Sequence, residues 1–191
     1  MRLDLAELAQ QHILSGSLAG KRLFTQLVGQ THPTSEVELC FLDFEKVQVA
    51  TSSFLRDSVV AYRDYVRRQY PTLYPIGVNV NGDVREELHS FLSSQRDAWI
   101  ICKLDEWEQA SSAAVVGHLE GRASETLMEV IKRGETDAPT LAMASDPEGT
   151  AAPTVWNNRL AALCEKGILI ELNRGRPRRY KPVIEGLSHG S

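Results

Sequence analysis

Residues 150–182 read TAAPTVWNNRLAALCEKGILIELNRGRPRRYKP, and this stretch decides the fold of the C-terminal part of the chain. Its first half predicts a helix, because Trp156, Leu160 and Leu163 recur at spacings of four and three residues and Gly167 is a suitable stop. An apolar run follows, then a turn rich in Arg, Gly and Pro, then a second run. The stretch therefore predicts a helix with one buried face, followed by two strands joined by a tight basic turn.

The outer face of this helix carries small and polar side chains that suit the edges of DNA bases. Asparagine pairs with adenine through two hydrogen bonds, and the methyl groups of Thr and Val contact the methyl group of thymine. The predicted base-contacting residues are Thr154, Val155, Asn157, Asn158 and Arg159. The basic turn and second strand suit phosphates and the minor groove, through contacts that weaken as salt rises. The predicted residues of that second group are Arg174, Arg176, Arg178, Arg179 and Lys181.

Two helices are predicted before this stretch. Leu127, Val130 and Ile131 form one face of a helix that starts near residue 124, and Gly134 ends it. Asp137 is a suitable cap for a short helix over residues 138–143. Three helices followed by a two-stranded turn resemble the winged helix-turn-helix domain of bacterial regulators, and the run WNNRLAALCEKGIL carries the resemblance most clearly.

The resemblance covers residues 122–183 and implies that the partner is double-stranded DNA. One winged helix contacts few bases and two-fold operators favour dimers, so a homodimer is expected. The charge distribution agrees, because residues 151–191 carry seven Lys or Arg against three Asp or Glu, whereas residues 1–110 carry eleven against fifteen. One departure counts against DNA: Asp146 and Glu148 put negative charge near the start of the third helix, where a phosphate would otherwise bind.

The first 110 residues predict strands that alternate with helices, which is typical of an α/β layer structure. Residues 3–14 fit either a short strand or a helix. The predicted helices cover residues 17–28, 54–69 and 84–92, and the predicted strands cover residues 37–44, 76–81, 98–104 and 113–119. The expected organisation is an α/β domain over residues 1–110, a connecting strand or linker over 111–123, an α+β winged-helix domain over 124–184 and a frayed tail over 185–191.

Residues 42–58 read LDFEKVQVATSSFLRDS, a strand that ends in Asp, a loop with paired serines and the start of a helix. This pattern, with the helix before it and the elements after it over about residues 15–105, resembles the STAS-like domains related to anti-sigma-factor antagonists. The resemblance implies that Ser52 matches a serine that such proteins can have phosphorylated, and that Ser52, Ser53 and Phe54 face a protein partner. Thr51 and Phe54 depart from the family's residues. From the residues alone, Ser52 or Ser53 is a helix cap.

Other classes of function lack supporting residues. Cys40, Cys102 and Cys164 lie far apart in apolar segments, as buried thiols do, and the five histidines have no metal-ligand spacing. We therefore expect no metal, no cofactor and no enzymatic activity. The N-terminus lacks the apolar core of a signal peptide and no segment is long and apolar enough to span a membrane, so a cytoplasmic protein without membrane contact is expected.

Two functional hypotheses follow from these patterns. In the first, the chain is a DNA-binding transcriptional regulator whose STAS-like domain senses a signal, binds a partner or forms a dimer. In the second, the chain is a protein-interaction switch that resembles an anti-sigma-factor antagonist, and the winged helix is an adaptor. The basic C-terminal end favours the first hypothesis.

Overall fold

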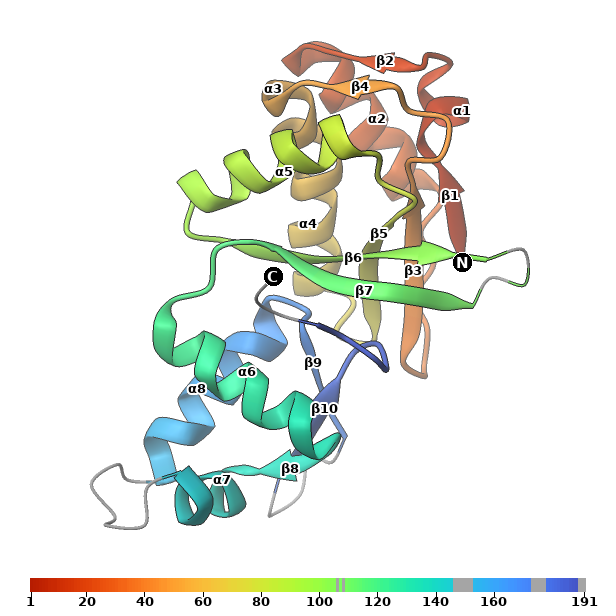
Figure 1. Cartoon of the computed structure of the whole chain (residues 1–191). Helices are drawn as coiled ribbons and strands as arrows, with labels where there is room; N and C mark the ends of the chain where they lie inside the picture. Colours follow the sequence, from red (N-terminus) through yellow and green to blue (C-terminus); the bar gives the residue numbers. More distant parts are fainter. Residues whose placement is uncertain (106, 108, 146–152, 173–177, 189–191) are drawn as a thin grey trace.

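The computed structural model describes residues 1–145, apart from 106 and 108, together with residues 153–172 and 178–188. Within these residues the fold is a mixed α/β structure built on a main sheet in the strand order β1-β3-β5-β6-β7 (Figure 1). The first four strands are parallel and β7 is antiparallel to β6. The strands are β1 (Arg2–Asp4), β3 (Glu38–Asp43), β5 (Leu73–Val78), β6 (Ala98–Leu104) and β7 (Ala110–Gly117).

Helices cover one face of the main sheet. The predicted helix over residues 54–69 is confirmed, and its apolar face of Leu55, Val59, Tyr62 and Val66 is fully buried. Residues 3–14 combine both predicted alternatives, because strand and helix follow each other there. The elements of this layer are α1 (Leu5–Ala9), β2 (Ile13–Leu14), α2 (Ser17–Gly29), β4 (Val49–Ala50), α3 (Ser52–Leu55), the π-helical turn η1 (Arg56–Val60), α4 (Ala61–Gln69) and α5 (Gly82–Ser94).

The C-terminal part of the chain packs on the other face of the main sheet. Successive side chains of a strand point to opposite faces, and β6 shows this clearly. Trp99 and Ile101 contact the helical layer, whereas Ile100 and Cys102 join a second core with residues of the C-terminal part. The elements of that part are α6 (Gly121–Arg133), β8 (Thr136–Asp137), α7 (Ala138–Ser145), α8 (Pro153–Glu165), β9 (Leu169–Glu171) and β10 (Arg179–Pro182).

The described residues of this part contain three helices and a small antiparallel sheet in the order β8-β10-β9. Asp137 caps α7 as the sequence predicts, because its Oδ1 accepts the Thr140 amide at 2.8 Å. The sequence did not predict β8, whose two residues pair with β10.

Two segments differ from their expected descriptions. Residues 110–117 form a full strand of the main sheet, so the segment expected as a connector is part of a β-hairpin with β6. The expected frayed tail is ordered over its described part: Leu187 is buried, and Ser188 exchanges backbone hydrogen bonds with Ala113 and Val115. Burial of an apolar side chain and pairing with a strand edge both oppose fraying.

Candidate nucleic-acid interface

Helix α8 is amphipathic in the way the sequence predicts. Trp156, Leu160 and Leu163 are buried in the second core, where they pack with residues of α6 and α7. Four of the five predicted base-contacting side chains on α8 are exposed: Thr154, Val155, Asn157 and Asn158. The first turns of α8 therefore present a small, largely polar surface to solvent.

Arg159, the fifth predicted base-contacting residue, behaves differently. It is half-buried, and its guanidinium lies over the Trp156 ring at 4.8 Å from the centroid. Such stacking is worth about 0.5–1 kcal/mol at exposed sites. The indole Nε1 of Trp156 is buried without a hydrogen-bond partner among the described residues. Arg159 therefore covers the edge of the core and is less suited to base contact than its neighbours.

The described basic residues of the second group lie on or beside β10. Arg178 and Arg179 are both more than half exposed, and each reaches an acid: Arg178 Nε is 3.6 Å from Glu171, and Arg179 Nε is 2.8 Å from Glu135. Exposed ion pairs of this kind contribute only about 0–1 kcal/mol, so a phosphate can compete with either acid. Lys181 is half-buried. Arg174 and Arg176 lie outside the described residues.

The start of α8 and the open end of the β9–β10 pair lie at the same end of the molecule, far from the main sheet (Figure 1). The other end of α8 is held against the helical layer. The Lys166 ammonium is 2.6 Å from Asp97, and Arg67 donates to the Cys164 carbonyl at 3.0 Å. α8 is thus anchored at its C-terminal end and exposed at its N-terminal end.

Asp97 is the central residue of the contacts that anchor the C-terminal end of α8. It binds both Lys166 and the buried Arg63, which also contacts Asp64. Burial raises the pKa of Asp97, but the charges and hydrogen bonds of Arg63 and Lys166 outweigh burial and leave the pKa below its usual range. Asp97 is therefore ionised at neutral pH and joins two elements that are distant in the sequence.

The predicted partner surface is only partly available. Phe54 is 1% exposed and belongs to the core beneath α2, so its expected role as a surface contact is wrong. Ser52 and Ser53 are half-buried at the start of α3. The predicted cap also differs, because Glu87 of α5 accepts both the amide of Ser52, at 2.8 Å, and its hydroxyl. A carboxylate from another helix thus satisfies the amide group that a local serine was expected to satisfy.

This contact makes added negative charge at Ser52 unfavourable. We expect Ser52→Asp to lower the free energy of unfolding by about 1 kcal/mol at low salt, because a second carboxylate faces Glu87. The same substitution in a Glu87→Gln background should be close to neutral. Urea denaturation of the four proteins measures both effects. Equal destabilisation in the two backgrounds would show that repulsion by Glu87 is not the cause.

A second polar cluster lies at the carboxyl ends of β3 and β5 and includes Arg2, the first residue of β1. The buried carboxylate of Asp43 accepts from Arg2 Nε at 2.8 Å and from Asn79 Nδ2 at 3.0 Å. Asp43 also accepts the Glu45 amide at 3.0 Å, as a loop-capping residue does. Its oxygens are satisfied by these contacts, so the cluster stabilises the strand ends and adds no unpaired group for chemistry.

The three cysteines are free thiols, of which Cys40 and Cys102 are buried and Cys164 is half-buried. Burial raises the pKa values of the Cys40 and Cys102 thiols to about 11 and that of Cys164 to about 12, which keeps them protonated at neutral pH. Among the described residues, His, Cys, Asp and Glu nowhere gather in a group of three that could hold a metal ion. Within the same residues, each helix is too short or too polar to span a lipid bilayer.

Comparison with known proteins adds no relative. No protein-family model matches the sequence, and no curated protein matches it either. The candidate interface is therefore defined by its geometry and chemistry alone.

Proposed function

We propose that the chain is a transcriptional regulator that binds duplex DNA through α8 and the β9–β10 pair, as a winged helix does. The observation that carries the proposal is the position of α8: it is anchored by Lys166 and buried along one side, while Thr154, Val155, Asn157 and Asn158 stand exposed at its free end. A rigid helix with short polar side chains at its N-terminal end suits the major groove.

The basic residues near β10 support the same proposal. The open end of the β9–β10 pair lies at the same end of the molecule as the start of α8 (Figure 1). Arg179 begins β10 and Arg178 precedes it, and both are more than half exposed, so they are available to phosphates that flank a bound major groove. The sequence adds Arg174 and Arg176 between β9 and β10. Such contacts position a protein on DNA without reading its sequence. Two copies on a two-fold site would double the number of bases that are read.

We further propose that the main sheet and its helices form a STAS-like part that senses a signal or mediates dimerisation. The support is the element order from β3 to β6, which matches the order expected from the resemblance. The buried Phe54 and the Glu87 contact at Ser52 disfavour a phosphorylation switch at this surface. The DNA-binding hypothesis is therefore preferred over the interaction switch.

The test is fluorescence anisotropy with labelled duplexes selected from a random pool, measured at several salt concentrations beside unselected duplex. We expect salt-dependent binding, and Arg178→Gln with Arg179→Gln should weaken it on every duplex and reduce the salt slope by about 2. Asn158→Ala should instead remove about 1–3 kcal/mol of discrimination for the selected sequence. Lys103→Gln, an exposed charge change on the main sheet, is the matched control.

Two results would contradict the proposal. One is the absence of binding at low salt. The other is binding that neither the arginine pair nor Asn158 affects, because contact would then lie elsewhere on the protein.

A further inference from the structure

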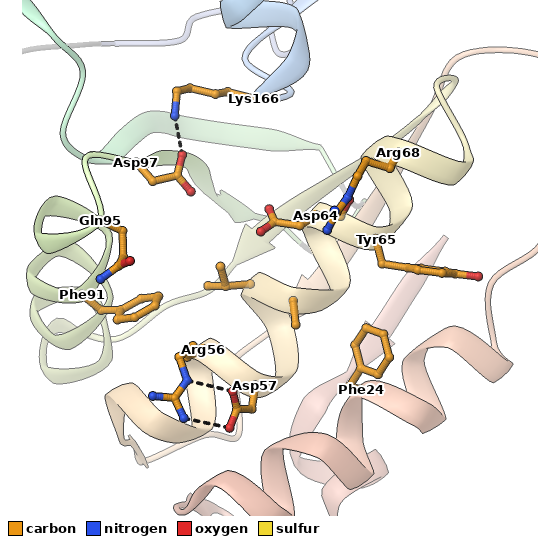
Figure 2. A pocket seen from close by; sticks show the side chains of 12 residues that line it. Phe24, Arg56, Asp57, Asp64, Tyr65, Arg68, Phe91, Gln95, Asp97 and Lys166 are labelled. Carbon is orange, nitrogen blue, oxygen red and sulfur yellow. Dashed lines mark hydrogen bonds and ion pairs between the residues drawn. The ribbon is translucent and has the colours of Figure 1, made fainter.

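A cleft of about 750 Å³ lies where the helical layer meets the end of α8. Figure 2 shows the Arg56–Asp57 pair at one end and the Lys166–Asp97 pair at the other, with Phe91 projecting from α5 toward η1. The volume is within the range of about 300–1,000 Å³ that is usual for small-molecule sites. The cleft is separate from the exposed surface of α8 that we propose for DNA.

A π-helical turn forms one wall of the cleft. In η1 the Ala61 amide bonds back to the Arg56 carbonyl, and the Ser58 hydroxyl satisfies the Phe54 carbonyl at 2.6 Å. The turn places Val60 and Ala61 in the lining. Single π turns inside α-helices occur frequently at functional sites. The turn therefore contributes both to the core, through Val59, and to the wall of the cleft, through Val60.

Among the described residues, the cleft is lined by three cations and three acids, and each acid already has an ion pair. Asp57 pairs with Arg56, Asp97 pairs with Lys166, and Asp64 pairs with Arg63 behind the lining. Arg68 is exposed, and its Nε donates to the Asp64 carbonyl at 3.0 Å. It has no ion pair with an acid in the described part of the chain, so its terminal amino groups can bind a carboxylate.

The apolar part of the lining is aromatic. Phe24 and Tyr65 meet edge to face at a centroid distance of 5.9 Å, and Phe91 lines the cleft from α5. All three rings are only partly buried. Aromatic rings favour the face or edge of another ring. The lining thus combines partly exposed aromatic surface with an unpaired guanidinium.

We propose that this cleft binds a small aromatic carboxylate. The carboxylate pairs with Arg68, and the ring lies on Val60 and Ala61 beside the aromatic side chains. Because the Lys166–Asp97 pair forms one end of the cleft, an occupied cleft contacts the same pair that anchors α8. The proposal does not depend on DNA binding, since the lining lies apart from the exposed residues of α8 and the test uses no DNA.

The probe is 3-phenylpropionate, titrated into ¹⁵N-labelled protein and followed by NMR chemical shifts. We expect saturable shifts at Ala61, Phe91 and Gln95, and binding of the neutral 3-phenylpropanol should be at least about tenfold weaker. Arg68→Gln should weaken the acid about tenfold through loss of the charged hydrogen bonds. Ala61→Leu should weaken it by filling the cleft. Arg85→Gln, an exposed arginine of α5 outside the lining, is the control and should bind as the unmodified chain does.

Three results would overturn the proposal. They are shifts that do not saturate, equal binding of the acid and the alcohol, and affinities unchanged in both Arg68→Gln and Ala61→Leu. Arg68 is exposed and Ala61 begins α4 at a half-buried position, so neither variant needs to disturb the core. Circular dichroism checks that both are folded.

Discussion

Asp97→Ala should lower the free energy of unfolding by about 2–3 kcal/mol, between the usual effects of breaking an exposed and a fully buried ion pair. The carboxylate holds Lys166 at 2.6 Å and also contacts Arg63, whose side chain is only 5% exposed. Without Asp97, Arg63 keeps only Asp64 as an acidic partner among the described residues, and α8 loses its ionic anchor. Urea denaturation at neutral pH measures the change.

Asp64→Ala is the matched control for that experiment. Asp64 binds the same guanidinium, but its side chain is 45% exposed and it contacts neither Lys166 nor α8 in the described residues. Its loss should therefore lower the free energy of unfolding by only about 1 kcal/mol. Similar losses of stability in Asp97→Ala and Asp64→Ala would show that Asp97 is not the central residue of the contacts that anchor α8.

The pH dependence of the Asp97 contribution has a definite sign. Its pKa is lower in the folded chain than in the unfolded chain, so its stabilisation is fully present above the unfolded value, about 3.9. The stabilisation is lost as the pH falls through the lower, folded value. The stability difference between the unmodified chain and Asp97→Asn should therefore be constant near neutral pH and shrink below about pH 4. A difference that grows in acid would contradict the assignment.

Gly117→Ala should destabilise the fold by about 2–5 kcal/mol, through a strained backbone together with overpacking. Gly117 ends β7 with φ +98°, and a Cβ atom there would lie 2.3 Å from the Asp97 carbonyl oxygen and 2.7 Å from Leu92 Cβ. The Asp97 carbonyl is a backbone group, so it can move away from the added methyl group only if the chain itself shifts. Thermal and urea unfolding should both show the loss.

Gly29→Ala provides the control for the added methyl group. Gly29 lies in α2, and beyond its chain neighbours and the backbone of its own helix no described atom lies within 4 Å of its added Cβ. Alanine is the better helix former, so this substitution should be neutral or stabilise by up to about 1 kcal/mol. Loss of stability in Gly29→Ala as large as in Gly117→Ala would mean that the close approach at Gly117 is not decisive.

Periodic apolar positions predicted most elements, because burial of one face imposes a spacing that the sequence displays. The start of β5 shows the limit of this approach. The sequence places that strand from Ile76, since Pro75 marks a break, but the strand begins at Leu73. β5 pairs with β6 only at Gly77 and Val78, and the Pro75 carbonyl accepts the Trp99 indole instead. A proline, which has no N–H to donate, is tolerated there because β5 and β6 do not pair at that position.

The candidate interface was predictable where it depends on one helix. The spacing of apolar residues within α8 is enough to predict that Leu160 lies on the buried face and Asn158 on the exposed face. The rest of the chain is not needed for this prediction. Contacts between distant residues were not predictable: Glu87 meets Ser52 across 35 positions, and Lys166 meets Asp97 across 69. Neither the π turn nor the cleft is marked by a periodic pattern of apolar residues in the sequence, because both depend on how α2, α4 and α5 pack together.

The second core, which the main sheet shares with the C-terminal part, bears on how such a chain can change during evolution. A module joined by a linker can be exchanged by recombination, because it closes its own core. Here Ile100 and Cys102 of the main sheet pack with Leu127 and Leu160 of the C-terminal part. A graft of either part onto another protein would expose one apolar surface, so the two parts are constrained to diverge together.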